Sequence, residues 1–407
     1  MQAGLINQAP TKNLRIHPTR ERQETGSVAN NFHHYKAKGG YMKNLPLKHP
    51  VPDIQSFVET IKGTRVPEKP PLVELFLDYE IVREIGRSYL GLEWIEPGAD
   101  KTSLRKYYKN WMEVYYRMGY DYVRPVGAGG LEFPGKSRPK EDTSTTTSRG
   151  IRHWAEETKG PISSWQEYER YPWPDPAKFD YWHYEFIAKN LPDGMGIFIC
   201  PSSGFLEIPL DTLFGYENLC FLMYDQPDLV EAVFNRVGEI LYAYYKDLAG
   251  LPRLAGFFQG DDMGFKTATL MPPDFLRKHV FPWHRKLAQL AHDNGLVYLL
   301  HACGNLNEVM DDLIDDVKID GRHSFEDEGN PIVDFKQKYG AKVAALGGID
   351  VDKLCRMPEN ALRAHTRKII EKCIQGGRFA VGSGNTVTNY VPITNYFAMV
   401  EEALNFC

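Results

Sequence analysis

The segment His301-Ala302-Cys303 combines residue types and a spacing that suit metal chemistry. Residues two apart on an extended segment point to the same side, so the imidazole of His301 and the thiol of Cys303 could reach one Zn²⁺ ion. A catalytic zinc takes three protein ligands and keeps one position open. The same spacing also suits a hydrogen-bonded histidine beside a small buried thiol. His301 and Cys303 are therefore predicted as two metal ligands of a site that still needs a third.

Two adjacent carboxylates, Asp261 and Asp262, follow the apolar run 254–259. Carboxylates in this position could hold a substrate, bind a metal or act as general acid and base. Two carboxylates at the end of a strand can also cap the loop or helix that follows. We predict that Asp261 and Asp262 are catalytic, as acid–base groups or as the source of the third metal ligand.

Both motifs end short apolar runs, and a longer helical pattern follows most of these runs. Eight runs have this character, at 72–77, 120–126, 196–200, 254–259, 296–301, 319–324, 342–347 and 378–382. Short apolar runs that alternate with helices are typical of parallel strands buried on both faces. Eight such units favour a closed barrel, because a doubly wound sheet usually has fewer strands. The predicted fold is α/β, a single-domain (β/α)8 (TIM) barrel.

The predicted barrel occupies residues 42–407 and is preceded by a polar stretch. Residues 1–41 are rich in Asn, Gln, Arg, Thr and His and are predicted to form a disordered tail. A long insertion, 127–193, follows the second predicted strand, and a loop of this kind is usually a lid or a pocket wall. Pro282 lies inside the helical pattern that starts at Pro272, so we expect a kink or a break there.

Polar residues at strand C-termini face the active site of a (β/α)8 barrel, and four further residues near these ends complete the predicted site. Tyr390, after the last run, is a candidate catalytic residue. Glu74, Arg124 and Asn385 are candidates for binding substrate. Other polar residues occupy comparable positions, namely Asp78, Ser202, Ser203, Glu207, Asn305, His323, Glu326, Asp350 and Ser383. This clustering at one end of the predicted barrel indicates an enzyme.

Composition and charge exclude several classes of partner. The formal net charge of −5 gives no broad positive surface for nucleic acid, and no basic block is long enough to bind a membrane. No run approaches the roughly 18 apolar residues of a membrane span, and residues 1–18 lack the apolar stretch of a secretory signal. The six cysteines are scattered without the regular spacing of a disulfide framework, so we expect them to be reduced thiols. We therefore expect a cytoplasmic protein that acts on a small molecule.

Several segments of the sequence resemble the uroporphyrinogen decarboxylase superfamily. They are Gly260-Asp261-Asp262-Met263-Gly264, Pro272-Pro273 with Phe275, His301-Ala302-Cys303-Gly304-Asn305, Gly347-Gly348-Ile349-Asp350, and Gly382-Ser383-Gly384-Asn385 followed by Val391-Pro392. The resemblance runs in order along residues 52–405. It implies a (β/α)8 barrel independently of the strand count.

The resemblance leaves two kinds of enzyme open. True uroporphyrinogen decarboxylases remove acetate carboxyls from a porphyrinogen without a cofactor, and they carry an arginine-rich N-terminal motif that binds the substrate's carboxylates. This sequence has no such motif around its first predicted strand, where it runs Leu75-Phe76-Leu77-Asp78-Tyr79-Glu80. An acidic stretch is poorly suited to holding an octacarboxylate, because like charges disfavour one another.

The other kind of member is a corrinoid-linked methyltransferase, several of which bind Zn²⁺ through His-x-Cys after one strand and a Cys after the last. The His-x-Cys motif is present at 301–303, but Asn385 stands where the late Cys would fall. A carboxylate such as Asp261, Asp262 or Glu326 would then have to replace it. Bound zinc would activate the substrate oxygen or thiol as a Lewis acid.

The resemblance therefore implies transfer of a methyl group between a small O-methyl or thiol substrate and a corrinoid protein. Zinc would be held by the enzyme, and the corrinoid (cobalamin) would be supplied by the partner protein. A porphyrinogen decarboxylase is the first alternative. A barrel that binds a corrinoid or tetrapyrrole without catalysis is the second, because the late cysteine is missing.

Overall fold

A computed structural model describes residues 45–98, 100–126, 129–141, 151–155 and 158–406 of the chain. The tail predicted at 1–41 lies outside these described residues. Within them, no helix is both long enough and apolar enough to cross a bilayer.

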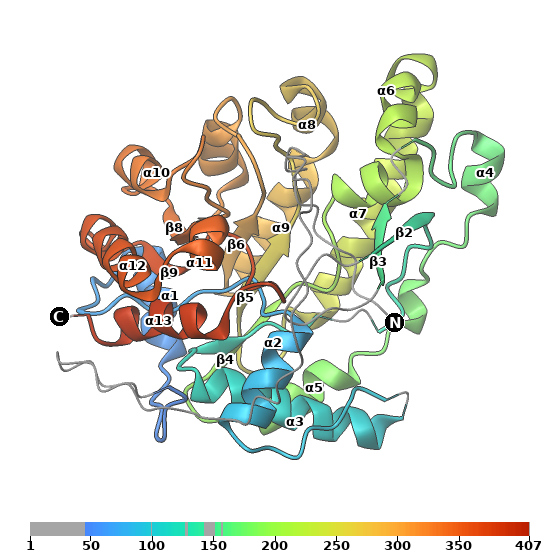
Figure 1. Ribbon diagram of the computed structural model, residues 1–407. Helices are drawn as coiled ribbons and strands as arrows, with labels where there is room; N and C mark the ends of the chain where they lie inside the picture. The colour runs from blue at the N-terminus through green and yellow to red at the C-terminus, as the bar shows by residue number, and fades with distance from the viewer. Residues whose placement is uncertain (1–44, 99, 127–128, 142–150, 156–157, 407) are drawn as a thin grey trace, which may run out of the picture.

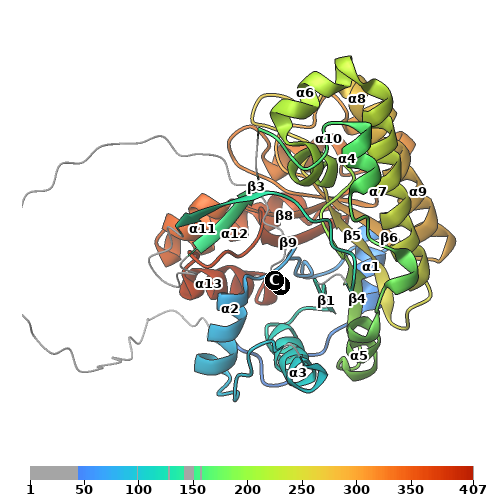
Figure 2. The same ribbon diagram turned by 90° about the vertical axis from the view of Figure 1, so that its right-hand side faces the viewer.

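The centre of the molecule is a curled sheet of parallel strands (Figures 1 and 2). Its seven strands follow the order β1-β4-β5-β6-β7-β8-β9. They are β1 (Tyr122–Val123), β4 (Gly196–Ile199), β5 (Leu254–Gly260), β6 (Val297–His301), β7 (Gly321–His323), β8 (Ala344–Ile349) and β9 (Phe379–Ser383). Nearly all of their residues are buried, as expected for strands covered on both faces. The predicted α/β class and seven of the predicted strands are confirmed.

The segment predicted as the first strand, 72–77, does not form a regular strand. It joins β9 through two isolated parallel bridges, Leu72 to Val381 and Leu77 to Val387. On its other side, the hydroxyl of Tyr122 in β1 donates to the carbonyl oxygen of Glu74 at 2.7 Å. The segment thus lies between β1 and β9, the two edge strands of the sheet. The predicted barrel is not closed by a regular backbone ladder here, because the Tyr122 side chain makes the contact on the β1 side.

Helices surround the sheet on its outside (Figure 1). Among the contacts with the sheet, α9 (Phe281–Asp293) packs on β6, α10 (Ile332–Tyr339) and α12 (Glu359–Cys373) on β8, and α13 (Ile393–Leu404) on β9. Further helices include α2 (Tyr79–Glu84), α3 (Lys101–Arg117), α6 (Tyr216–Asp225), α7 (Pro227–Leu248), α8 (Pro273–His279) and α11 (Val351–Arg356). The break expected at Pro282 is confirmed, because α8 ends at His279 and Pro282 stands in the first turn of α9.

Between β1 and β4, the chain leaves the parallel sheet. It forms the antiparallel pair β2 (Ser137–Glu141) and β3 (Ile151–Ala155), then α4 (Trp165–Arg170) and α5 (Trp182–Asn190). The proline-rich stretch 171–176 lies between these two helices, outside any helix interior or sheet.

The inside of the curled sheet is filled by apolar side chains from the strands and from α1 (Ile54–Lys62). Phe57 of α1 packs edge-on against Tyr122 and Phe198, at ring-centroid distances of 5.2 and 5.8 Å. The N–H of Ile54 donates to the carbonyl of Gly194, just before β4 begins. Helix α1 therefore covers the N-terminal end of the sheet, and the polar residues gather at the opposite end.

Candidate functional site

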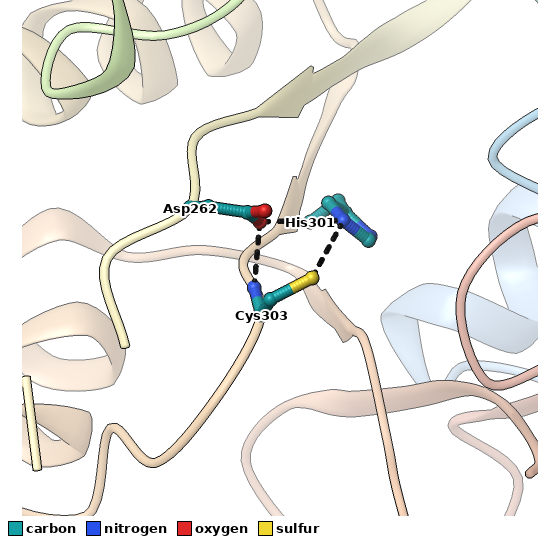
Figure 3. A group of neighbouring side chains, drawn as sticks. All are labelled: Asp262, His301 and Cys303. Carbon is teal, nitrogen blue, oxygen red and sulfur yellow. Dashed lines mark hydrogen bonds and ion pairs between the residues drawn. The ribbon is translucent and has the colours of Figure 1, made fainter. Parts of the chain in front are cut away.

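Three predicted site residues meet at the C-terminal ends of β5 and β6 (Figure 3). Asp262 follows β5, His301 ends β6, and Cys303 lies two residues further along. One ligand atom from each lies within 4.8 Å of the others. Nε2 of His301 lies 3.4 Å from Oδ1 of Asp262 and 3.5 Å from Sγ of Cys303. We call these three residues the metal-ligand cluster.

The donor atoms of the cluster fit a zinc ion. They comprise one imidazole nitrogen, one thiol sulfur and one carboxylate oxygen, which are the three ligand types that zinc takes, and three protein ligands leave a position open for substrate. Burial and the charge of Asp262 raise the pKa of the Cys303 thiol well above its usual value. A thiolate here therefore needs a nearby cation. Asp262 is the carboxylate whose position fits the third ligand that the sequence left open.

The charge state of Asp262 is set by its neighbours. Burial by itself would raise its pKa, but the hydrogen bond and charge of His301 and the backbone N–H of Cys303 together lower it below the usual value. That N–H donates to Oδ1 of Asp262 at 2.8 Å. The carboxylate of Asp262 thus contacts both other residues of the metal-ligand cluster.

The loop that carries Cys303 is held in backbone contact with the loop after β5. Gly304 has a φ of +80°, and a Cβ there would lie 2.3 Å from the backbone carbon of Gly264. The N–H of Asn305 donates to the carbonyl of Phe265 at 2.8 Å. Only glycine allows this close approach, which brings Cys303 up to Asp262.

Asn385, predicted to bind substrate, lies against the cluster. Its Nδ2 donates to Sγ of Cys303 at 3.1 Å, from the loop after β9. The hydroxyl of Ser324, which follows β7, faces the same sulfur at 3.8 Å. The residue that stands in place of the late cysteine therefore contacts a predicted zinc ligand directly.

The two adjacent aspartates have different surroundings. Asp261 is fully buried, and its carboxylate accepts hydrogen bonds from the backbone N–H groups of Leu206 and Glu207, each at about 3.0 Å. Its Oδ2 also pairs with Nε2 of His284 at 2.8 Å, and Nδ1 of His284 lies 2.6 Å from the hydroxyl of Tyr298. These contacts hold the backbone at Leu206 and Glu207 in place. The carboxylate of Asp262 instead contacts His301 and Cys303.

Glu207 was predicted to lie near the end of a strand, but no role was predicted for it. It directly precedes a π-helical segment (Ile208–Phe214) and is buried. Burial, followed by the charges of Asp262 and Asp261, raises the pKa of Glu207 well above its usual value. The signal available in the sequence was its position shortly after the third predicted strand.

Glu74 and Arg124, predicted to bind substrate, are buried within the sheet. The N–H and hydroxyl of Ser383 both donate to the carboxyl of Glu74, and burial raises the pKa of Glu74 to about 8. Nε of Arg124 donates to the carbonyl of Phe258 and Nη1 to that of Leu75, both at 3.1 Å. Glu74 thus joins the segment 72–77 to β9, and Arg124 joins the end of β1 to β5 and to the segment 72–77.

The remaining predicted site residue, Tyr390, is half-buried in the loop between β9 and α13, five positions beyond Asn385. In the same loop, the N–H of Asn389 donates to the carboxylate of Asp78 at 2.8 Å.

His323 is a further residue that the structure joins to the cluster. Its Nδ1 lies 2.7 Å from Nδ1 of His301, and its Nε2 lies 3.1 Å from the carbonyl oxygen of Ser383. Burial, the neighbouring His301 and the charges of Arg124 and Arg322 lower its pKa well below the usual value, although the Ser383 carbonyl opposes this. The sequence indicated His323 only as a polar residue at a strand end.

Comparison with known proteins shows what the C-terminal half of the chain is similar to. Residues 210–406 match the family model of uroporphyrinogen decarboxylase (URO-D). A methyltransferase from Methanosarcina mazei has a similar structure, with a TM-score of 0.62 and 16% sequence identity over 88% of this chain and 99% of that one. At this identity the likeness shows the fold. No curated protein matches the sequence significantly.

A second solved structure, named for vitamin-B12-independent methionine synthase and from Listeria monocytogenes, shares 12% identity with this chain. The match covers 83% of this chain and 97% of that one, with a TM-score of 0.48. The family match spans β5 to β9 and so includes all three residues of the metal-ligand cluster. Residues 210–406, just under half of the chain, are therefore similar to the uroporphyrinogen decarboxylase family.

Proposed function

We propose that this protein is a zinc-dependent methyltransferase that moves a methyl group between a small O-methyl or thiol substrate and a corrinoid protein. The observation that carries the proposal is the metal-ligand cluster, in which Asp262 completes the donor set begun by His301 and Cys303. When bound there, zinc would supply Lewis-acid activation of the substrate oxygen or sulfur.

The groups around the cluster would orient the reacting heteroatom. Asn385 lies at the sulfur side of the cluster, where its amide could contact both Cys303 and a substrate. Asp261 holds the backbone at Leu206 and Glu207, so its part in the proposed reaction is to position the chain beside Asp262. In the demethylating direction, the heteroatom–methyl bond breaks, the heteroatom keeps the bonding electrons and takes up a proton, and the methyl group passes to the reduced corrinoid of the partner.

An exposed apolar surface supports a protein partner. Phe221 and Tyr224 of α6 are 62% and 79% exposed, and a cavity of about 340 Å³ lies between α6, α7 and α8. The hydroxyl of Tyr216 at the start of α6 donates to the carbonyl of Leu270, in the segment that links the cluster loop to α8. Large exposed apolar side chains gathered in one place commonly mark a protein contact.

A porphyrinogen decarboxylase fits the site less well. The end of the sheet carries several acidic groups, among them Asp262, Glu207 and Glu326. The charge of Asp262 contributes to raising the pKa of both Glu207 and Glu326. A substrate with many carboxylates would add more negative charge to this region, which is unfavourable.

The proposal is tested by metal content and methyl transfer. Protein purified without chelator is expected to hold about one zinc per chain. Demethylation of a panel of methyl ethers and methyl thioethers is followed through the absorbance change of the corrinoid from cob(I)alamin to methylcob(III)alamin. Absence of bound zinc in the wild-type protein, or binding of zinc that survives replacement of both His301 and Cys303, would contradict the proposal.

A further inference from the structure

We infer that Arg322 is a positioning residue for the metal-ligand cluster, because its guanidinium braces the loop that carries Cys303 against the loop that follows β7. The inference rests on the proposed function for its metal. The bracing contacts themselves belong to the metal-free protein and can be tested there.

The sheet places Arg322 beside the strand that leads to Cys303. Arg322 lies in the middle of β7 and pairs with Leu300 of β6. Neighbouring side chains of a strand point to opposite faces, so Arg322 points away from the face on which His323 meets His301. On that other face its guanidinium lies against Phe335 of α10.

The guanidinium of Arg322 joins two loops at the C-terminal end of the sheet. Its Nη2 donates to the carbonyl of Gly304, which directly follows Cys303, at 3.1 Å. Its Nη1 lies 3.3 Å from Oδ1 of Asn330 in the loop after β7. Nδ2 of Asn330 donates in turn to the carbonyl of Ser324 at 3.2 Å. The rigid fork of arginine donors thus spans from the cluster loop to the next loop along the sheet.

The surroundings of Arg322 are unfavourable for a charge that serves stability alone. The residue is 2% exposed, and burial lowers its pKa to about 10, so it remains a cation at neutral pH. Within the described residues it forms no ion pair with a carboxylate, and its buried Nε has no hydrogen-bond partner.

Two aromatic rings offset part of this cost. The centroids of Phe325 and Phe335 lie 5.3 and 5.4 Å from the guanidinium carbon of Arg322. An apolar side chain of similar volume is often at least as stabilising as a buried charge. Stability therefore does not account for an arginine here, whereas its hold on the Gly304 carbonyl does.

The consequence concerns the position of the Cys303 sulfur. The N–H groups of Cys303 and Asn305 both donate to acceptors in the loop after β5, at 2.8 Å each. Arg322 holds the carbonyl between them from the β7 side. Groups that orient metal ligands without touching the metal typically contribute about 10- to 100-fold to metal affinity. Arg322 would act in this way through Gly304.

The first test reads the loop in metal-free protein. Hydrogen–deuterium exchange, resolved by peptide with mass spectrometry, should show protected amides at Cys303 and Asn305 in the wild-type protein. Arg322→Met keeps an apolar stem against the two phenylalanine rings but removes both donors. Protection at these two amides should fall about 10- to 100-fold, as expected for loss of hydrogen bonds to a charged group. Protection in β8 and β9 should stay near the wild-type level.

A milder variant covers the case in which Arg322→Met does not fold. Asn330→Ala removes one acceptor of the guanidinium from a half-buried loop position and leaves the buried arginine in place. It should lower protection at the same two amides by a smaller factor. Unchanged exchange at Cys303 and Asn305 in both variants, or an equal rise of exchange throughout the sheet, would overturn the inference whether or not the protein binds zinc.

The second test measures zinc affinity by competition with a chromophoric chelator. Arg322→Met should weaken binding about 10- to 100-fold, and Arg322→Lys should lie between it and the wild-type protein, because one ammonium cannot reproduce the fork. Arg253→Met is the matched control, since Arg253 donates to the carbonyls of Leu191 and Pro192 at the opposite end of the sheet. It should retain wild-type affinity. Wild-type affinity in Arg322→Met, or an equal loss in Arg253→Met, would overturn the inference, whereas a wild-type protein that binds no zinc would overturn the proposed function.

Discussion

The backbone N–H of Cys303 donates to Oδ1 of Asp262 at 2.8 Å across 41 positions of the sequence. The same oxygen lies 3.4 Å from Nε2 of His301. One carboxylate oxygen therefore aligns the end of β5 with the loop after β6, independently of any bound ion. The protein itself therefore arranges the metal-ligand cluster.

Removal of a single cluster side chain should abolish zinc binding. Cys303→Ala or Asp262→Asn leaves only two ligands, which are too few for a zinc site. Elemental analysis should give about one zinc per wild-type chain and close to none in either variant. Cys355→Ala, which changes a half-buried thiol on α11, serves as the control and should retain the metal. Full zinc content in Cys303→Ala would remove that residue from the ligand set.

Asp261 and Asp262 should differ in what they stabilise. Asp261→Asn breaks a buried pair with His284 and weakens bonds to two backbone N–H groups, so a loss of about 3 kcal/mol in unfolding free energy is expected. Asp262→Asn should lose zinc with a smaller change in the stability of the metal-free protein. Urea unfolding of both metal-free variants measures the difference. Equal destabilisation by the two substitutions would show that the adjacent carboxylates are equivalent.

The stability of the protein should fall as pH rises because of Glu74. Burial raises its pKa from 4.5 to about 8, so between these values the folded protein holds a proton that the unfolded chain has released. The contribution of Glu74 is therefore complete below pH 4.5 and is lost as pH rises towards 8. Glu74→Gln removes this titration and should flatten the pH dependence of the unfolding free energy over that window. An unchanged slope in Glu74→Gln would exclude Glu74 as its source.

Asn385→Cys should bind zinc more tightly than the wild-type protein. The side chain at this position contacts Sγ of Cys303, so a second sulfur there could complete a four-ligand site. A closed coordination shell leaves no position for substrate, and methyl transfer should fall. Chelator competition and turnover measure the two effects, with Asn385→Ala as the control for loss of the amide. Weaker zinc binding in Asn385→Cys than in Asn385→Ala would contradict the placement of this residue.

Gly347→Ala should be more destabilising than a strained backbone alone explains. Gly376 has a similarly positive φ of +75° with open space around it, so Gly376→Ala should cost about 1 kcal/mol from strain alone. Gly347→Ala adds collision with the Ser383 carbonyl and the His323 ring. Comparison of the two unfolding free energies isolates the steric part. Equal losses in both variants would show that the His323 contact with Ser383 is not tightly packed.

The sequence by itself determined the class of fold. Apolar runs of five to seven residues are typical of strands buried on both faces, and seven of them became neighbouring parallel strands. The break expected at Pro282 also followed from the sequence, because proline lacks the N–H that a helix interior needs and is tolerated in the first turn, where Pro282 lies in α9. The run 72–77 was harder to predict, because its pairing depends on β9 and on the Tyr122 side chain, both remote in the sequence.

Only the tertiary structure separated the candidates within the site. Adjacent residues on an extended chain point to opposite sides, so Asp261 and Asp262 could not both face one centre, but which of them faces it depends on the packing of β5 against β6. In the same way, the pairing of His301 with His323 follows from strand register, which no local pattern encodes. The sequence fixes which side chains stand at strand ends, and the register of the assembled sheet decides which of them meet.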